Sequence, residues 1–215
     1  MRVLVAGAAG NTGKRIVRRL LERGHEVRAL ARKAEQLPEL EDLGAEGCRV
    51  DLERDEDARI AGAVRGCEAT IFAAGAGPGS GPARKETMDY GGAVKLMQAA
   101  GAEGAGRYVL LSSMGVVDPG GAVEEMQPYL IAKAKADVQL QASGLSYTIV
   151  RPGRLTDGAG TGRISAAPEL ARRGEISRED VAETLVECLE VENTRRRTFE
   201  ILAGSTPIRE ALEGV

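Results

Sequence analysis

The segment VLVAGAAGNTGKRIVRRL, residues 3–20, decides the fold class of this chain. It begins as a short apolar run, passes through Gly7, Gly10 and Gly13, and then places apolar residues at helical spacing. A strand, a glycine-rich turn and a helix in this order are typical of a phosphate-binding loop. Two such loops compete for the segment, the nucleotide-triphosphate loop and the dinucleotide loop.

The triphosphate loop G-x-x-x-x-G-K-[S/T] fails at both of its ends. Counted back from Gly13 and Lys14, the first glycine of that loop falls on Ala8. The hydroxyl residue that would bind magnesium falls on Arg15. Both mismatches favour the dinucleotide loop.

The dinucleotide loop fits the three glycines, with the spacing G-x-x-G-x-x-G in place of the commoner G-x-G-x-x-G. We expect Gly7 to end the strand in a tight turn, Gly10 to let the backbone approach a pyrophosphate, and Gly13 to allow close helix–strand packing. The helix N-terminus then offers free N–H groups and a positive dipole to the phosphates. A glycine-rich turn without a ligand is the alternative.

The segment RALARK, at the end of the second predicted strand, indicates NADP(H) rather than NAD(H). An NAD site usually carries an acid here to hold the ribose 2′-hydroxyl, whereas this chain has Arg32 and Lys33. A guanidinium at this point suits the 2′-phosphate of NADP. A solvated basic pair at a helix start is the alternative.

The segment VDLERDED places Asp51 and Leu52 just past the third predicted strand, within reach of an adenine ring lying across the sheet edge. Asp51 fits a second role equally well, as the capping residue of the helix that follows. Both interpretations stay open at this point.

Apolar runs alternate with helical patterns along most of the chain. Strands are predicted at 2–6, 26–31, 46–50, 69–74, 107–112 and 146–151, with helices at 11–24, 33–43, 55–66, 85–104 and 129–144. This alternation predicts right-handed crossovers and a doubly wound parallel α/β sheet, the Rossmann fold, as one domain over residues 1–215. We expect a glycine-rich loop at 75–83 and a substrate-side loop region at 152–175. A helix near 178–190 and a strand near 198–203 would complete a small, elaborated C-terminal edge.

Composition narrows the class of protein. The chain has 215 residues, 43% hydrophobic and 28% charged, with a net charge of −3 and no charge block, so neither nucleic acid nor an anionic membrane is an expected partner. No apolar run reaches the length of a membrane span, and the N-terminus enters a strand without a signal-peptide core, which predicts a cytoplasmic protein.

Cys48, Cys67 and Cys188 are too far apart for a disulfide framework, His25 is an isolated turn residue, and no metal site is predicted. The run RRR, residues 195–197, is expected to be a solvated approach to the last strand.

A second group of residues carries candidate chemistry. Tyr129 and Lys133 lie four residues apart on one face of a predicted helix, and Ser112 and Ser113 follow the fifth predicted strand on the cofactor side. A tyrosine phenol becomes a useful acid–base group when a nearby ammonium stabilises its phenolate, a role that suits Lys133. A serine hydroxyl would orient a substrate carbonyl or its oxyanion. The alternative is a surface tyrosine, a solvated lysine and serines that cap a strand end.

The GAAGNTG loop, Ser113, the Tyr129/Lys133 pair and SGLSYTIVRPG together resemble the short-chain dehydrogenase/reductase superfamily. The resemblance is closest to its atypical branch of small NAD(P)-binding proteins, which includes NmrA-like redox sensors, a biliverdin/flavin reductase and plastid-envelope NADP-binding proteins. RRGEISREDVAETLVECLE, residues 172–190, resembles the C-terminal segment of that branch, so the similarity spans almost the whole chain.

The resemblance implies a role for each matching residue. The pyrophosphate would be lined by Gly7, Gly10, Asn11, Thr12 and Gly13; the 2′-phosphate by Arg32, beside Lys33; adenine by Asp51 and Leu52; the adenosine ribose by Ala73, Ala74 and Gly75; and nicotinamide by Arg151, Pro152, Gly153, Arg154 and Leu155. Lys133 could also hydrogen-bond the cofactor ribose. Ser113, Tyr129 and Lys133 would form the catalytic set.

Three functions are compatible with these residues. The first is an NADPH-dependent reductase of a small carbonyl, flavin or quinone-like acceptor. The second is an NADP(H)-binding redox sensor with a protein partner, because residues 152–175 offer no aromatic anchor for a substrate. The third is a sugar-nucleotide epimerase or dehydratase, which shares the catalytic set but usually carries a larger C-terminal substrate domain.

Overall fold

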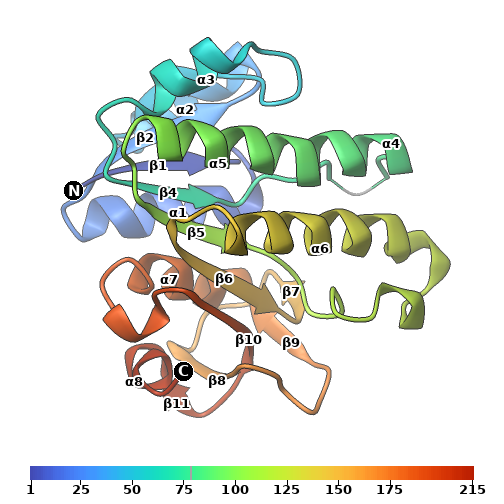
Figure 1. Ribbon diagram of the computed structural model, residues 1–215. Helices are drawn as coiled ribbons and strands as arrows, with labels where there is room; N and C mark the ends of the chain where they lie inside the picture. Colours follow the sequence, from blue (N-terminus) through green and yellow to red (C-terminus); the bar gives the residue numbers. More distant parts are fainter. Residues whose placement is uncertain (78) are drawn as a thin grey trace.

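The central sheet is formed by strands that alternate with helices along the chain, and the computed structural model describes them over residues 1–77 and 79–215 (Figure 1). Its strands are β1 (Arg2–Ala6), β2 (Glu26–Ala31), β3 (Glu46–Arg49), β4 (Ala69–Phe72), β5 (Arg107–Leu111), β6 (Ser146–Pro152), β8 (Arg163–Ala167), β10 (Arg197–Ala203) and β11 (Thr206–Pro207). Their order in the sheet is β11-β8-β10-β6-β5-β4-β1-β2-β3. Strands β7 (Arg154–Thr156) and β9 (Glu175–Ser177) form a separate parallel pair.

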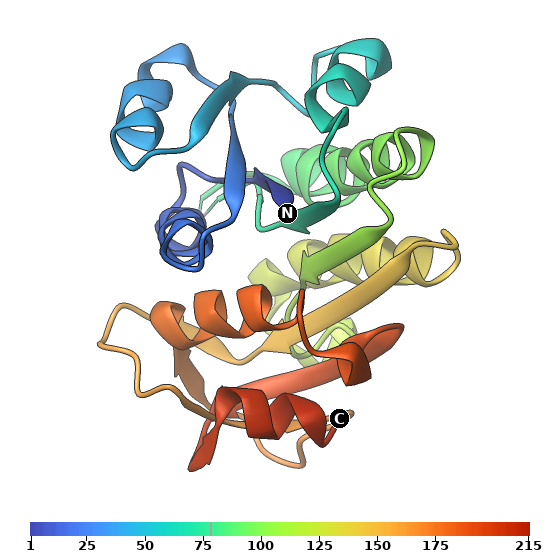
Figure 2. The same cartoon turned by 90° about the vertical axis from the view of Figure 1, so that its left-hand side faces the viewer.

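Helices cover both faces of the sheet (Figure 2). One layer holds α1 (Asn11–Glu22), α2 (Leu37–Asp42), α7 (Arg178–Glu187) and α8 (Ile208–Glu213); the other holds α3 (Asp57–Val64), α5 (Ala93–Ala102) and α6 (Gln127–Gln141). The short helix α4 (Pro82–Arg84) and the π-helical turn η2 (Lys85–Gly92) lead directly into α5. Four 3₁₀ turns complete the described elements, η1 (Ala34–Gln36), η3 (Pro119–Gly121), η4 (Glu124–Met126) and η5 (Glu192–Thr194). In the described part of the chain, no helix combines the length and apolar character needed to cross a membrane.

Alternation along the strands explains why the sheet needs two helix layers. In β1, Val3 and Val5 pack into the core beneath α1 and α7, whereas Leu4 packs into the core beneath α3 and α5. Successive side chains of a strand point to opposite faces, so a strand that is apolar throughout must be covered twice. The predicted doubly wound Rossmann fold is confirmed.

The strand order fixes where ligands bind. Strand β1 pairs in parallel with β2 on one side and with β4 on the other, starting at Val3↔Ala69. The chain therefore reverses its winding direction between β1 and β4. Ligands of open α/β sheets bind at such a switch point, beyond the carboxyl ends of the strands.

The C-terminal part of the chain differs most from the sequence prediction. Residues 152–175, predicted as a loop region, contain β7 and β8, and β8 runs antiparallel to β10. Only Ile164 of β8 is buried, so this strand lacks the alternating pattern that would have identified it. The predicted loop at 75–83 includes Pro78, which lies outside the described residues. Its last two residues, 82–83, already belong to α4.

Candidate functional site

The glycine loop closes tightly against the end of β4. Gly7 has φ +81°, and a Cβ added to it would lie 2.6 Å from the Cα of Ala74. A Cβ on Gly13 would lie 2.0 Å from the carbonyl oxygen of Gly7, to which the Gly10 amide donates a hydrogen bond of 3.0 Å. Gly7 thus makes the predicted tight turn, and Gly13 permits the first turn of α1 to pack on the loop itself.

The N-terminus of α1 has the features of an anion site. Gly10 is its N-cap, no side chain caps it, and its first turn contains no acidic residue. The amides of Asn11, Thr12 and Gly13 occupy the positions of a helix whose N–H groups lack intrahelical acceptors. Unpaired donors and the positive end of the helix dipole suit a phosphate, so these residues fit the pyrophosphate of a dinucleotide.

Arg32 and Lys33 lie exposed just beyond β2, on the side of the switch point away from β4. The Arg32 guanidinium is 3.8 Å from the carboxylate of Glu53. Glu53 is held by Thr87, at 2.7 Å, and by Arg84, at 3.2 Å. Although desolvation acts to raise it, the pKa of Glu53 is lowered because Thr87, Arg84 and Arg32 together favour the carboxylate. An ionised Glu53 thus faces Arg32 at this corner.

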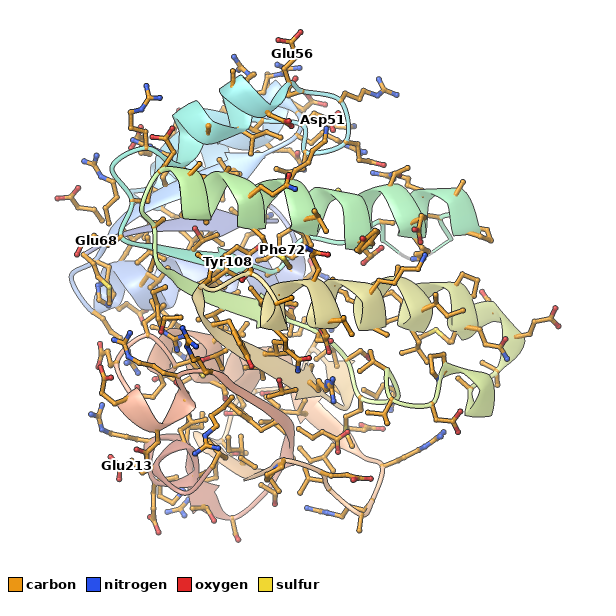
Figure 3. The ribbon with its side chains drawn as sticks, in the orientation of Figure 1. Asp51, Glu56, Glu68, Phe72, Tyr108 and Glu213 are labelled. Carbon is orange, nitrogen blue, oxygen red and sulfur yellow. The ribbon has the colours of Figure 1, made fainter. Side chains whose placement is uncertain are left out.

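Asp51 shapes the turn after β3 rather than capping α3 (Figure 3). Its carboxylate accepts from the Glu53 amide at 2.9 Å, and its own amide donates to Asp55 at 2.8 Å. The N-cap of α3 is Glu56, five residues further on. Leu52 is 6% exposed and belongs to the core beneath α3 and α5.

The end of β4 continues the site beside the glycine loop. The Ala73 amide donates to the Ala6 carbonyl at 2.9 Å, so the chain follows β1 for one residue beyond β4. Ala74 is buried against Gly7, whereas Gly75 is exposed. A Cβ on Gly75 would lie 2.9 Å from a carboxylate oxygen of Asp89.

The structure brings the predicted catalytic set together at the neighbouring strand end. Ser112 and Ser113 follow β5, while Tyr129 and Lys133 lie in the first two turns of α6. Lys133 is 3% exposed; its ammonium donates to the Leu111 carbonyl at 2.9 Å and lies 6.0 Å from the centre of the Tyr129 ring. Burial lowers the pKa of Lys133, and the nearby Asp89 opposes that shift.

The environment of Tyr129 differs from the expectation that Lys133 would promote its ionisation. Burial and the negative charge of Asp89 raise the pKa of Tyr129 to about 12, against a weaker opposing effect of the Ser113 hydroxyl. Burial of the phenol is the main reason. The second is Asp89, whose carboxylate lies 3.9 Å from the Lys133 ammonium and compensates its charge. Tyr129 is therefore protonated at neutral pH.

Asp89 and Asp137 are two functional candidates that the sequence analysis missed. Both are 1% exposed, and Asp137 forms an ion pair of 2.9 Å with Arg151. Asp137 follows Lys133 by four residues, a spacing that places both on one face of α6 and was available as a signal. Burial raises the pKa of Asp137, opposed by Arg151.

The segment RPGRL, residues 151–155, forms ion pairs, a hydrogen bond and close backbone contacts with other parts of the protein. Arg154 is exposed and paired with Glu175. A Cβ on Gly153 would lie 2.4 Å from the Gly174 carbonyl oxygen, so this glycine allows a close approach of two backbone segments. Pro152 accepts a hydrogen bond from the Met114 amide at 3.0 Å, and Leu155 packs against the core.

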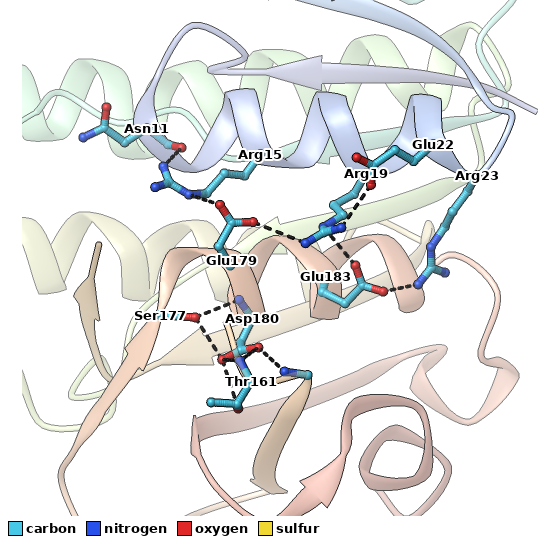
Figure 4. A network of polar contacts seen from close by, with 11 residues as sticks. Asn11, Arg15, Arg19, Glu22, Arg23, Thr161, Ser177, Glu179, Asp180 and Glu183 are labelled. Atoms are coloured by element: carbon cyan, nitrogen blue, oxygen red, sulfur yellow. Dashed lines mark hydrogen bonds and ion pairs between the residues drawn. The ribbon is translucent and has the colours of Figure 1, made fainter. Parts of the chain in front are cut away.

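A ladder of ion pairs joins α1 to α7 (Figure 4). Arginines at four-residue spacing on α1 face glutamates at four-residue spacing on α7: Arg15 with Glu179 at 2.8 Å, Arg19 with Glu183 at 3.3 Å and Arg23 with Glu187 at 2.5 Å. Arg15 also donates to the Asn11 carbonyl at 2.7 Å. The ladder therefore reaches the first residue of the helix whose N-terminus faces the candidate phosphate site.

Comparison with known proteins agrees with this geometry. A family model described as NAD(P)H-binding matches residues 7–192. The chain is 42% identical over 214 residues to the uncharacterized sugar epimerase YhfK of Bacillus subtilis, covering 99% of each chain. Its structure superposes with a TM-score of 0.94 on a protein described as an NAD-dependent epimerase/dehydratase from Bacillus halodurans, at 39% identity and 100% coverage of both. The oxidoreductase ylbE from Lactococcus lactis gives a TM-score of 0.87 at 30% identity, covering 100% of this chain and 96% of that one.

Proposed function

Because this chain belongs to the NAD(P)H-binding family, within the atypical branch of the short-chain dehydrogenase/reductase superfamily, we propose that it is an NADPH-dependent reductase. Its acceptor would be a small carbonyl, flavin or quinone-like molecule. The observation that carries this proposal is the meeting of Ser113, Tyr129 and the buried Lys133 at the strand end that neighbours the glycine loop. Burial raises the pKa of Tyr129, which suits its phenol to the role of proton donor. A bound nicotinamide would supply the hydride.

The protein's own residues would supply the proton and the orientation. Ser113 donates a hydrogen bond to the acceptor oxygen and fixes its direction. As the hydride forms the new C–H bond, the electron pair of the C=O bond moves to oxygen, which takes the phenolic proton of Tyr129. Solvent returns that proton to Tyr129 afterwards.

Arg32 supports NADPH as the preferred form of the cofactor. Its exposed guanidinium follows β2, where a 2′-phosphate would replace the ribose hydroxyl. Glu53 lies 3.8 Å away and restrains the side chain through an ion pair. A restrained guanidinium loses less conformational freedom when it binds a phosphate.

A redox sensor without turnover is the second candidate. The charge of Lys133 is compensated by Asp89, so the Tyr129/Lys133 pair lacks a feature that activates a tyrosine base. An epimerase is the third candidate, and the names of the relatives from the two Bacillus species favour it. An epimerase would return its cofactor to the starting redox state after each turnover.

The deciding experiment is NADPH oxidation by the purified protein against aldehydes, ketones, quinones and free flavin. Tyr129→Phe should lower kcat by about 100-fold or more, the range of general acid catalysis, and leave the Kd of NADPH almost unchanged. Tyr147→Phe, a half-buried tyrosine of β6, is the matched control. Tight NADPH binding without oxidation of any acceptor would replace the reductase with the sensor. Conversion of a sugar nucleotide without net NADPH oxidation would replace it with the epimerase.

A further inference from the structure

Asp89 is, with Asp137, one of the two most buried carboxylates near the candidate site. It lies in η2, a π-helical turn of eight residues between α4 and α5, and is 1% exposed. Such turns are rare and occur frequently at functional sites. An ionised carboxylate is strongly disfavoured in a buried position unless charges or donors surround it, so the partners of Asp89 indicate its role.

These partners come from two different parts of the site. One carboxylate oxygen accepts a hydrogen bond of 3.1 Å from the Ala76 amide, in the loop after β4. The other lies 3.9 Å from the Lys133 ammonium on α6. The absence of a side chain at Gly75 leaves room for the carboxylate, because a Cβ there would lie 2.9 Å from it. Asp89 therefore joins the loop beside the glycine turn to the lysine beneath Tyr129.

The position of Lys133 follows from these contacts. Its ammonium donates to the Leu111 carbonyl and lies over two aromatic rings, 5.6 Å from the centre of Phe72 and 6.0 Å from the centre of Tyr129. No hydrogen bond joins Lys133 to the Tyr129 hydroxyl among the described residues. The ammonium is thus directed to the backbone, to Asp89 and to the ring faces.

Other charges around Tyr129 come from three elements. Lys85 of η2 lies 5.5 Å from the ring centre and donates to the Gly77 carbonyl at 2.7 Å. Asp137 of α6 is paired with Arg151 of β6 at 2.9 Å, and its negative charge acts on Tyr129 in the same direction as that of Asp89, but less strongly. Lys85 and Lys133 are therefore the nearby cations that favour a phenolate, and Asp89 is the anion placed to compensate Lys133.

We propose that Asp89 is a positioning residue which holds Lys133 on the ring face of Tyr129 and keeps Tyr129 a proton donor. The site would then favour reduction, in which Tyr129 gives up a proton, over the reverse oxidation, in which a phenolate must accept one. This inference rests on the proposed reductase for its direction, but the control of Tyr129 ionisation by Asp89 is measurable without any substrate.

The test is a spectrophotometric titration of Tyr129, taken as the difference between each protein and the same protein carrying Tyr129→Phe. In Asp89→Asn the ionisation constant of Tyr129 should rise at least tenfold, because the carboxylate that opposes the phenolate has become neutral. Glu86→Gln is the matched control: it removes a carboxylate three residues earlier in η2, exposed and paired with Lys135 at 2.8 Å. An unchanged Tyr129 titration in folded Asp89→Asn would overturn the proposal.

A second comparison covers the case in which Asp89→Asn leaves Lys133 uncompensated and unfolds the protein. Removing both buried charges is tolerated far better than removing one. Tyr129 in Asp89→Asn/Lys133→Met should then ionise at least tenfold more readily than in Lys133→Met alone. Equal ionisation in these two variants would also overturn the proposal.

Turnover separates this inference from the function on which it rests. In an active reductase, Asp89→Asn should move the alkaline limb of the kcat profile to lower pH and raise the ratio of alcohol oxidation to carbonyl reduction. A Tyr129 titration that shifts in a protein without turnover would retain the action of Asp89 on Tyr129 and reject the reductase. A normal rate of carbonyl reduction with an unshifted Tyr129 titration in Asp89→Asn would retain the reductase and reject the action of Asp89 on Tyr129.

Discussion

Gly7 and Ala74 meet backbone to backbone at the switch point of the sheet, where a Cβ on Gly7 would come within 2.6 Å of the Ala74 Cα. The φ of Gly7 is +81°, a conformation that disfavours any residue with a side chain. The tight turn and the close packing of the loop on β4 therefore both require glycine at position 7, with a hydrogen atom in place of a side chain.

Gly7→Ala should lower the free energy of unfolding by about 2–4 kcal/mol, from left-handed strain plus a contact that the backbone must relieve. It should also raise the Kd of NADPH at least tenfold, because the loop moves away from β4. Urea unfolding and cofactor titration measure the two effects.

Gly24→Ala is the control for that prediction. Gly24 has a similar φ of +76°, but a Cβ there would meet nothing within 4 Å. It should cost only about 1 kcal/mol and leave NADPH binding unchanged. Equal effects of the two substitutions on unfolding free energy and on NADPH binding would show that the contact with Ala74 contributes to neither.

Arg32→Gln should weaken NADPH binding at least tenfold and leave NADH binding unchanged, because it removes a charge-assisted hydrogen bond worth roughly 1.5–3 kcal/mol. The measurement is a pair of fluorescence titrations with the two cofactors. Arg54→Gln, an exposed arginine in the turn after β3, serves as the control for net charge. A parallel loss of affinity for NADPH and NADH would separate Arg32 from the 2′-phosphate.

Arg23→Gln should destabilise the fold by about 1–2 kcal/mol, because it takes a cation from carboxylates that are only partly solvated. Glu187 has a side chain that is 6% exposed, and Arg209 remains as its second partner at 2.6 Å, which limits the loss. Arg18→Gln, on the same helix and exposed, should cost less than about 0.5 kcal/mol. Thermal unfolding of the two variants side by side tests this difference, which would vanish if the ladder were only a surface feature.

His25 should make stability depend on pH near neutrality. Burial lowers the pKa of its imidazole, so the folded protein binds a proton less readily than the unfolded chain, whose histidine titrates near pH 6.5. Its contribution is therefore present above about pH 6.5 and lost as the pH falls through the lower, folded value. His25→Gln should flatten that part of the stability curve.

This prediction is directly observable, because the chain contains one histidine. Its imidazole resonance in the NMR spectrum of the folded protein should titrate below pH 6.5. A midpoint at or above that value would contradict the role of burial. Comparing the urea midpoints of wild type and His25→Gln at two pH values then measures the contribution of His25 to the pH dependence of the unfolding free energy.

Sequence alone predicted the parallel part of the sheet well, because β1, β4 and β5 are buried along almost their whole length and helical segments that end near glycine separate the strands. The glycine loop also followed from sequence, since Gly7 is required by φ and Gly13 by close packing. Strand β8 could not be predicted in this way, because one buried residue in five gives no period and its pairing with β10 is set by tertiary contact.

The sequence identified the candidate catalytic residues, but it did not predict the shifts in the pKa values of Tyr129 and Lys133. The segment 85–104 reads as one continuous α-helix, and α-helical spacing gives no warning of the extra residue in each turn of η2. That extra residue changes which side chain faces α6, so the arrival of Asp89 beside Lys133 depends on a backbone irregularity. Asp89 then adds to the effect of burial in raising the pKa of Tyr129.

The ladder between α1 and α7 has a consequence for biosynthesis. Arg15 and its partner Glu179 are separated by 164 residues. At a translation rate of about 5–20 residues per second, α1 waits roughly 8–30 seconds for α7, the helix that covers its charged side. Helix α1 is thus covered only late in synthesis, and a stalled or truncated product would expose its row of arginines beside an unfinished core.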